Sequence, residues 1–109
     1  MAYDEELADR VRKVLRGRKG VVERKMFGGL AIMLQGHMAC GVLQGDLVVR
    51  VGPEAYKEAL KSPHARVMDF TGRPMRGFVV VDADGTLSDG DLEDWIARGV
   101  TFARSLPPK

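Results

Sequence analysis

Residues 30–51 read LAIMLQGHMACGVLQGDLVVRV, a sequence in which Gln35-Gly36 and Gln44-Gly45 divide three short apolar runs. Glycine-containing pairs between apolar runs of this length are typical of β-hairpin turns. A fourth run precedes them across Gly28-Gly29, which indicates either a further turn or a bulge. The pattern therefore predicts four antiparallel strands in a meander, over residues 22–27, 30–34, 38–43 and 47–51.

Three helices are expected around this meander, because apolar residues recur at helical spacing between clear start and stop signals. Asp4 is a natural N-cap for the first helix, and Ser88 with Asp91 resembles a capping box for the last. Gly52-Pro53 places proline in the first turn of the second helix. The expected helices run from Asp4 to about Gly17, from Gly52-Pro53 to Ser62-Pro63, and from Ser88 to Leu106-Pro107-Pro108.

Two more strands, 67–70 and 77–81, are expected on either side of the loop that carries Arg73 and Arg76. The predicted order is α-β-β-β-β-α-β-β-α, which describes an α+β domain with helices on an antiparallel sheet. Several strands, notably 30–34 and 78–81, are apolar at consecutive positions. We therefore expect both faces of the sheet to be covered, either by the three helices or by a second subunit, and we expect a homodimer.

Length and composition narrow the class of protein. At 109 residues the chain is predicted to be a single domain, and Cys40, its only cysteine, has no partner for an intramolecular disulfide. The first residues are acidic and no apolar run approaches the length of a membrane span, so we expect a cytoplasmic protein without a membrane anchor. The net charge is +2, with basic residues gathered before position 26 and acidic residues between 82 and 94. Helix ends that sort their charges by the macrodipole are the simplest explanation, and a molecule with a basic side and an acidic side is the alternative.

Four motifs follow one another along nearly the whole chain. They are Lys25-Met26-Phe27-Gly28-Gly29, the pair of runs Met38 to Val42 and Leu47 to Val51, Arg50-Val51-Gly52-Pro53-Glu54-Ala55-Tyr56, and Met68-Asp69-Phe70-Thr71-Gly72-Arg73-Pro74-Met75-Arg76-Gly77. Together they resemble the TfoX/Sxy N-terminal domain family. The resemblance implies an α+β fold similar to the secretion-chaperone-like group, with no established catalytic activity. Gly28-Gly29 lacks the surrounding glycines of a nucleotide-binding loop, so no cofactor is expected.

The same resemblance implies a function class. In the family's namesake regulators, this domain precedes a C-terminal helical domain, and the protein promotes natural competence genes as a transcriptional co-activator. The sequence ends at Lys109, so we expect one stand-alone TfoX N-terminal-like domain over residues 1–109, without that second domain. The competence role does not follow directly from the resemblance for that reason.

The loop before the last predicted strand is the strongest candidate for a binding site. Gly72, Pro74 and Gly77 restrict or specially permit backbone geometry around Arg73 and Arg76, and guanidinium groups held in this way bind phosphate or carboxylate bidentately. If the sheet order brings the strands together, the partner or anion contact comprises Lys25, Arg50, Arg66, Arg73, Met75 and Arg76. The alternative is that Arg73 and Arg76 pair internally with Asp69, Glu54 or Asp82, and the sequence leaves both interpretations open.

Other candidate chemistry is better explained by structure. Cys40 could act with His37 or His64 as base, but its apolar neighbours favour a buried thiol. These three residues do not form a zinc pattern, and the segment from Asp82 to Gly85 lacks the further ligands of a calcium loop, so no metal is expected. Trp95 is predicted to be a core anchor. Core filling also best explains the methionines Met26, Met33, Met38 and Met68, with Met75 the exception that faces a partner.

Three function classes remain, in this order. The first is a non-enzymatic regulatory or adaptor module that contacts another protein, with transcription machinery as a candidate partner. The second is a nucleic-acid-binding domain, which needs its basic residues on one surface. The third is a small-molecule enzyme of unknown class, which needs a pocket with perturbed titratable groups. The basic residues that the second class requires together are Arg12, Lys13, Arg18, Lys19, Arg73 and Arg76.

Overall fold

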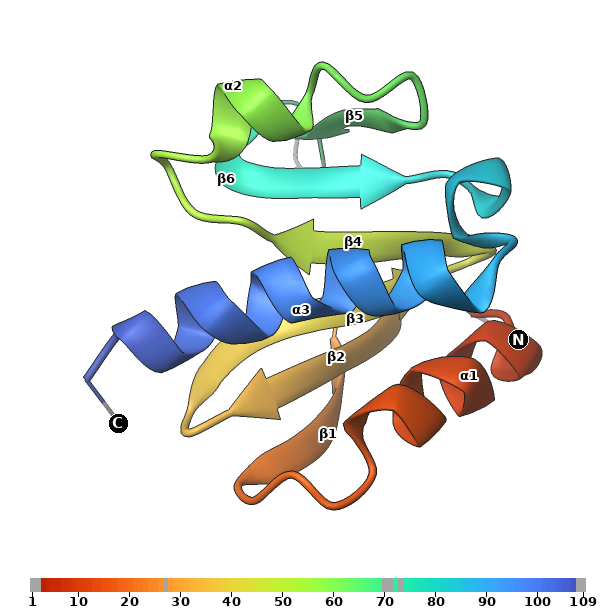
Figure 1. Ribbon diagram of the computed structural model, residues 1–109, viewed down its shortest axis with the longest axis vertical. Helices are drawn as coiled ribbons and strands as arrows, with labels where there is room; N and C mark the ends of the chain where they lie inside the picture. Colours follow the sequence, from red (N-terminus) through yellow and green to blue (C-terminus); the bar gives the residue numbers. More distant parts are fainter. Residues whose placement is uncertain (1–2, 27, 70–71, 73, 108–109) are drawn as a thin grey trace.

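The computed structural model describes residues 3–26, 28–69, 72 and 74–107, which form one six-stranded antiparallel sheet with helices packed on it (Figure 1). The strands stand in the order β1-β2-β3-β4-β6-β5. The α+β class and the order of elements agree with the prediction from sequence. The elements are α1 (Glu5–Leu15), β1 (Val21–Met26), β2 (Gly29–Leu34), β3 (His37–Leu43), β4 (Asp46–Arg50), α2 (Tyr56–Ala59), β5 (Ala65–Asp69), β6 (Pro74–Val81) and α3 (Asp89–Ser105), with a short 3-10 turn at Ala83–Thr86.

Local sequence signals account for the ends of the long helices. The Asp4 carboxylate accepts hydrogen bonds from the backbone N–H groups of Glu6 and Leu7, at 2.9 and 3.3 Å, and so caps α1. The Ser88 hydroxyl accepts from the N–H of Asp91 at 3.0 Å and caps α3. Both predicted N-caps are confirmed. In the β2–β3 turn, Gln35 and Gly36 both have positive φ, 55° and 86°, as a tight two-residue hairpin requires.

The second helix is shorter than predicted. Gly52-Pro53 opens a turn, and only Tyr56–Ala59 is helical. The two later strands begin earlier than predicted, at Ala65 and Pro74, and Phe70, the predicted end of the first of them, lies outside the described residues. The Gly28-Gly29 segment closes a hairpin in which Met26 pairs with Gly29, and the irregular pairing lies instead next to Ile32.

All three helices lie on one face of the sheet, where α1 and α3 stand in front of the strands in Figure 1. This face forms the main core, which includes Val11 of α1, Ile96 of α3 and Ala59 of α2. The sequence predicted that either the helices or a second subunit would cover both faces. The helices of the described residues cover only one face, so the first of these alternatives is wrong, and the second stays a prediction. The second face has its own apolar cluster of Ala31, Met38, Val48, Met68 and Val80, with Met33, Leu43, Met75 and Phe78 packed against it.

The methionines accordingly divide differently from the prediction. Met38 and Met68 are buried in the second-face cluster, as expected for core filling. Met75 is partly buried against the same cluster, whereas Met26 on the edge strand is exposed. The alternation of apolar and polar residues along the chain does not distinguish Met26 from Met75, because the burial of each depends on which strands are central in the sheet.

Candidate functional site

A groove of about 730 Å³ opens between residues 51–59, which end in α2 and are called the α2 segment, and residues 94–105 of α3. Concave sites with mainly apolar walls are the usual places where proteins bind ligands or partner side chains. The groove is lined by Val51, Gly52, Pro53, Glu54, Ala55, Glu58, Ala59, Asp94, Ala97, Arg98, Thr101, Phe102 and Ser105.

Two glycines let the chain turn out of the sheet at the base of the groove. The backbone N–H groups of Val51 and Gly52 both donate to the carbonyl of Gly77, at 2.8 and 3.0 Å, so β4 ends in a tight junction with β6. Gly52 has φ +88°, and a Cβ at this position would lie 2.4 Å from the Phe102 ring. Only glycine allows the ring of Phe102 to pack directly on this backbone. The position of α3 against the α2 segment, and with it the groove, depends on this contact.

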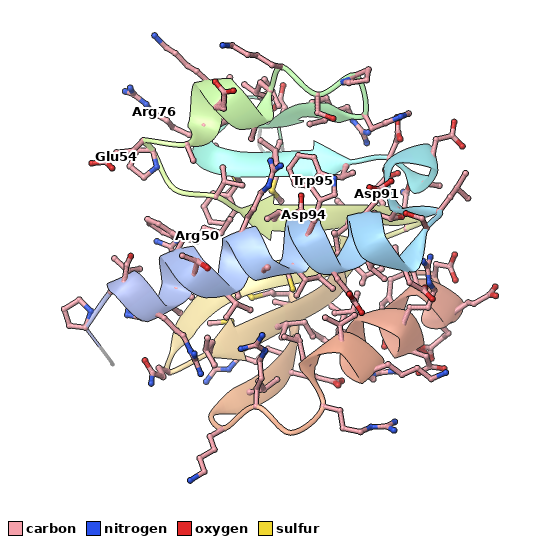
Figure 2. All side chains as sticks on the ribbon, in the orientation of Figure 1. Arg50, Glu54, Arg76, Asp91, Asp94 and Trp95 are labelled. Atoms are coloured by element: carbon pink, nitrogen blue, oxygen red, sulfur yellow. The ribbon has the colours of Figure 1, made fainter. Side chains whose placement is uncertain are left out.

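The groove combines an apolar floor with a charged rim. Val51 and Ala59 are buried in the floor, and the small side chain of Ala97 leaves room above it. The rim carries the carboxylates of Glu54, Glu58 and Asp94, with Arg98 the one cationic residue of the lining. Figure 2 shows Asp94 and Glu54 on opposite sides of the gap between α3 and the α2 segment.

The rim charges have only weak internal partners. Arg98 donates to Asp94 at 3.3 Å, and its guanidinium lies 4.3 Å from the centre of the Trp95 ring. Glu58 pairs with Lys61 at 3.1 Å, and both side chains are about three-quarters exposed. Exposed ion pairs contribute about 0–1 kcal/mol each, so these carboxylates can exchange their partners for those of a bound protein.

Trp95 confirms the prediction of a core anchor. It is buried in the main core, and the Arg98 guanidinium lies over its ring. A cation over an indole ring is stabilised by the ring quadrupole.

Arg50 is the predicted contact residue that lies nearest the groove. Its guanidinium stacks on two rings, 5.4 Å from the centre of Phe78 and 5.2 Å from that of Phe102. Arg76 lies one strand away, immediately before Gly77, and Figure 2 places Arg50, Glu54 and Arg76 at the same end of the molecule. Neither arginine takes part in an ion pair among the described residues.

The other predicted contact residues are dispersed. Arg66 donates to Asp46 at 2.8 Å across the intervening strand β6, so it pairs internally. Lys25 lies on β1, at the opposite edge of the sheet from β6 and β5, so the sheet order does not bring it to Arg76. Met75 packs on the second-face cluster. Arg73 lies outside the described residues.

The basic N-terminal segment is partly engaged in internal contacts. Arg10 donates to the carbonyls of Thr86 and Leu87 and so ties α1 to the start of α3. Arg12 donates to both carboxylate oxygens of Glu23, at 2.8 and 3.0 Å, and this hydrogen bonding holds the pKa of Glu23 below its usual range. The guanidinium groups of Arg10 and Arg12 thus lie near the start of α3 and on β1, whereas Arg76 lies near the start of β6. Of the residues that nucleic-acid binding needs on one surface, Arg12 is therefore bound to β1, whereas Arg76 lies on β6, with three strands between the two.

The thiol and imidazole residues do not meet. Cys40 is fully buried in the main core, where desolvation raises the pKa of its thiol to about 12. His37 Nε2 lies 2.7 Å from the carbonyl of Pro107, and His64 Nδ1 lies 3.2 Å from the Asp82 carboxylate. The prediction of a buried thiol is confirmed. Within residues 3–107, apart from positions 27, 70–71 and 73, no three His, Cys, Asp or Glu side chains converge as metal ligands would.

We expect Cys40 to react slowly with thiol reagents in the native protein. The fully buried position and the raised pKa both suppress the thiolate, which is the reactive species. Labelling with an aromatic disulfide reagent should proceed at the rate of unfolding, and rapidly in denaturant. Rapid stoichiometric labelling under native conditions, with a Cys40→Ala variant as the blank, would contradict the burial.

The groove was not visible in the sequence. Ala97, Thr101 and Phe102 read as part of an amphipathic helix, and the groove arises only because the α2 segment packs beside them. The one available signal was Gly52, since a glycine at a strand end often permits close approach of another element. None of the described helices is long and apolar enough to cross a lipid bilayer.

Sheet order and helix placement define a small α+β domain. The family model of the TfoX N-terminal domain matches residues 13–103, most of the chain. The chain therefore belongs to the TfoX N-terminal domain family. No curated protein matches it.

Proposed function

We propose that this protein is a non-enzymatic regulatory or adaptor module that binds a segment of another protein in the groove between α2 and α3. The observation that carries the proposal is the groove itself, which has a buried apolar floor and an exposed rim of carboxylates. The only thiol is buried with a raised pKa, so this potential nucleophile is not presented to a substrate. Membership of the TfoX N-terminal domain family supports a regulatory role.

The chemistry of the groove favours a basic, amphipathic partner segment. Glu54, Glu58 and Asp94 give the lining an excess of negative charge over the single cation of Arg98. Lys or Arg side chains of the partner would meet these carboxylates, and one or two apolar side chains would fill the space above Ala97 and Ala59. A protein of the transcription apparatus is the partner class that the family suggests.

A photoreactive residue in place of Ala97 tests the proposal in cells. Ala97 is exposed, so the substitution leaves the fold intact, and it lines the groove. We expect a discrete protein adduct whose linked peptide is rich in Lys, Arg and apolar residues. A second change, Thr101→Trp, fills the groove and should reduce the adduct at least about tenfold, because the anchor side chain can no longer enter.

The matched control is Glu93→Trp, which adds the same ring to an exposed position of α3 outside the groove. Both tryptophan variants should melt close to the parent, since exposed substitutions change stability by about ±0.5 kcal/mol. An adduct that survives Thr101→Trp as well as Glu93→Trp does not come from the groove. Cross-linking to nucleic acid in place of protein would favour the second function class.

A further inference from the structure

Strand β1 leaves one side of its backbone without a strand partner among the described residues. It stands at the end of the sheet order and pairs only with β2, through six consecutive residue pairs from Val21↔Leu34 to Met26↔Gly29. An edge of this kind presents a row of unpaired backbone N–H and C=O groups, which is a template for another strand.

The two edges of the sheet differ in how they are protected. The pairing of β5 with β6 shifts between Val67 and Asp69, and irregular pairing of this kind twists an edge away from further strands. The pairing of β1 with β2 has no such shift. Strand β1 is therefore the better template of the two.

The side chains of β1 are largely exposed. Val22 is 53 % exposed and Met26 43 %, and both point to the second face because Val22 is paired with Met33. Glu23 and Lys25 alternate with them and point to the helix-covered face. Two large apolar side chains exposed on one edge strand favour a partner that covers them. The three charged residues between them, Glu23, Arg24 and Lys25, protect the edge against strands in general and so restrict the partner to one with matching charges.

We propose that β1 pairs antiparallel with β1 of a second copy of this chain, about a two-fold axis through Arg24, so that the two sheets become continuous. In such a dimer the axis is perpendicular to the sheet, so opposite residues must point to the same face. Their two positions therefore differ by an even number. The only registers allowed are therefore those in which the two-fold axis passes through one residue of β1.

Centring on Arg24 matches the side chains of the two copies. Val22 then lies opposite Met26 of the second copy, and Glu23 lies opposite Lys25 of the second copy, each pair occurring twice. Apolar and opposite-charge pairs directly across antiparallel strands stabilise the pairing. Arg24 faces its own counterpart on the axis, which is one unfavourable pair against four favourable ones.

The neighbouring registers are poorer. Centring on Glu23 places Val22 opposite Arg24 and sets two carboxylates on the axis. Centring on Lys25 places Arg24 opposite Met26 and sets two ammonium groups on the axis. Charge complementarity thus selects one register. The Arg12 guanidinium already holds Glu23 in position, and a carboxylate has acceptor sites left for Lys25 of the second copy.

A charge exchange tests both the interface and its register. The wild-type chain should sediment at twice the 12.0 kDa of one chain. Lys25→Glu sets like charges opposite Glu23, and Glu23→Lys does so opposite Lys25, so each variant alone should dimerise at least about tenfold more weakly. An equimolar mixture of the two variants restores both opposite-charge pairs and should recover dimers.

Val67→Lys on β5 is the matched control, because Val67 is similarly exposed, at 39 %, but lies on the other edge strand. It should leave the dimer unchanged, and melting curves should show all variants folded. A wild-type chain that remains at 12.0 kDa over the whole accessible concentration range overturns the proposal. A dimer that Val67→Lys disrupts but that the charge variants do not affect also overturns it.

Cross-linking checks the axis directly. Arg24→Cys places two thiols opposite each other with Cβ atoms about 4.5–5.5 Å apart, close enough for a disulfide after a small adjustment. Mild oxidation should link the two chains of this variant. Lys25→Cys alone should not cross-link, because its counterpart lies opposite Glu23, and the wild-type thiol is buried. If Lys25→Cys cross-links to the same extent as Arg24→Cys, the two-fold axis does not pass through Arg24 and the proposed register is wrong.

Discussion

Replacing Gly99 with alanine should destabilise the protein by about 2 kcal/mol or more, with a fall in the melting temperature of about 10 °C or more. Gly99 lies on the buried face of α3, and a Cβ there would lie 2.2 Å from the carbonyl oxygen of Ala39 in β3. That oxygen belongs to the backbone, so α3 would have to lift off the sheet. The helix propensity of alanine recovers only about 1 kcal/mol of this cost.

Gly90→Ala in the same helix is the matched control. No atom lies within 4 Å of the added Cβ at Gly90, so this change should leave stability unchanged or raise it by up to about 1 kcal/mol. Thermal unfolding of the two variants, followed by circular dichroism, separates contact with β3 from helix propensity. Equal melting temperatures would mean that α3 does not touch the backbone of β3 as closely as described.

Gly52→Ala is expected to cost about 2–4 kcal/mol and to disturb the groove. Two effects add: a residue with a Cβ is strained at φ +88° by about 1–2 kcal/mol, and the Cβ would lie 2.4 Å from the Phe102 ring. Chemical denaturation gives the loss of stability, and the photo-cross-linking residue at position 97 reports whether the groove still binds.

Gly17→Ala isolates the backbone contribution, because Gly17 has nearly the same φ, +87°, with no atom within 4 Å of the added Cβ. Gly52→Ala should therefore be the more destabilised of the two by the cost of displacing the ring. In a Phe102→Ala background, which lacks the ring, Gly52→Ala should cost less stability than it does in the parent. If the two glycine variants are equally stable, Phe102 does not pack on Gly52.

The sequence predicted the elements whose signals are local. Hairpin turns such as Gln35-Gly36 and the caps Asp4 and Ser88 depend on a few neighbouring residues, so these boundaries agree within one or two positions. The same is true of Cys40, whose burial follows from apolar neighbours in a strand that becomes central.

Features that depend on distant parts of the chain could not be predicted. Strand β5 contains Ala65 and Arg66, which carry no strand pattern, and it extends over them because β6 supplies hydrogen-bond partners. The sheet order that separates Lys25 from Arg76 is a property of the whole topology. The placement of all three helices on one face has the same origin, and it leaves the second face to its own apolar cluster.

The candidate site shows the same division. Arg50 was identified from the sequence, but its stacking on Phe78 and Phe102 needs two elements that are far apart along the chain. The groove itself needs α2 and α3 to come together. Small residues such as Ala97 carry no chemical signature of their own, so a pattern of residue types could not reveal them.

The order of the strands also bears on how the molecule opens. Strands β1 to β4 form a meander, on which α3 packs, and β5 pairs with β6 as a separate unit. Among the described residues, the pairing of β4 with β6 is the one seam of the sheet that joins these two units. Units of this kind can separate without global unfolding. The groove lies beside the end of that seam, because Val51 and Gly52 follow β4 directly, and its two sides are α2, which contacts β6, and α3, which contacts β4. A bound segment would clamp the two units together, and amide hydrogen exchange at the β4–β6 seam would slow far more than exchange within the meander.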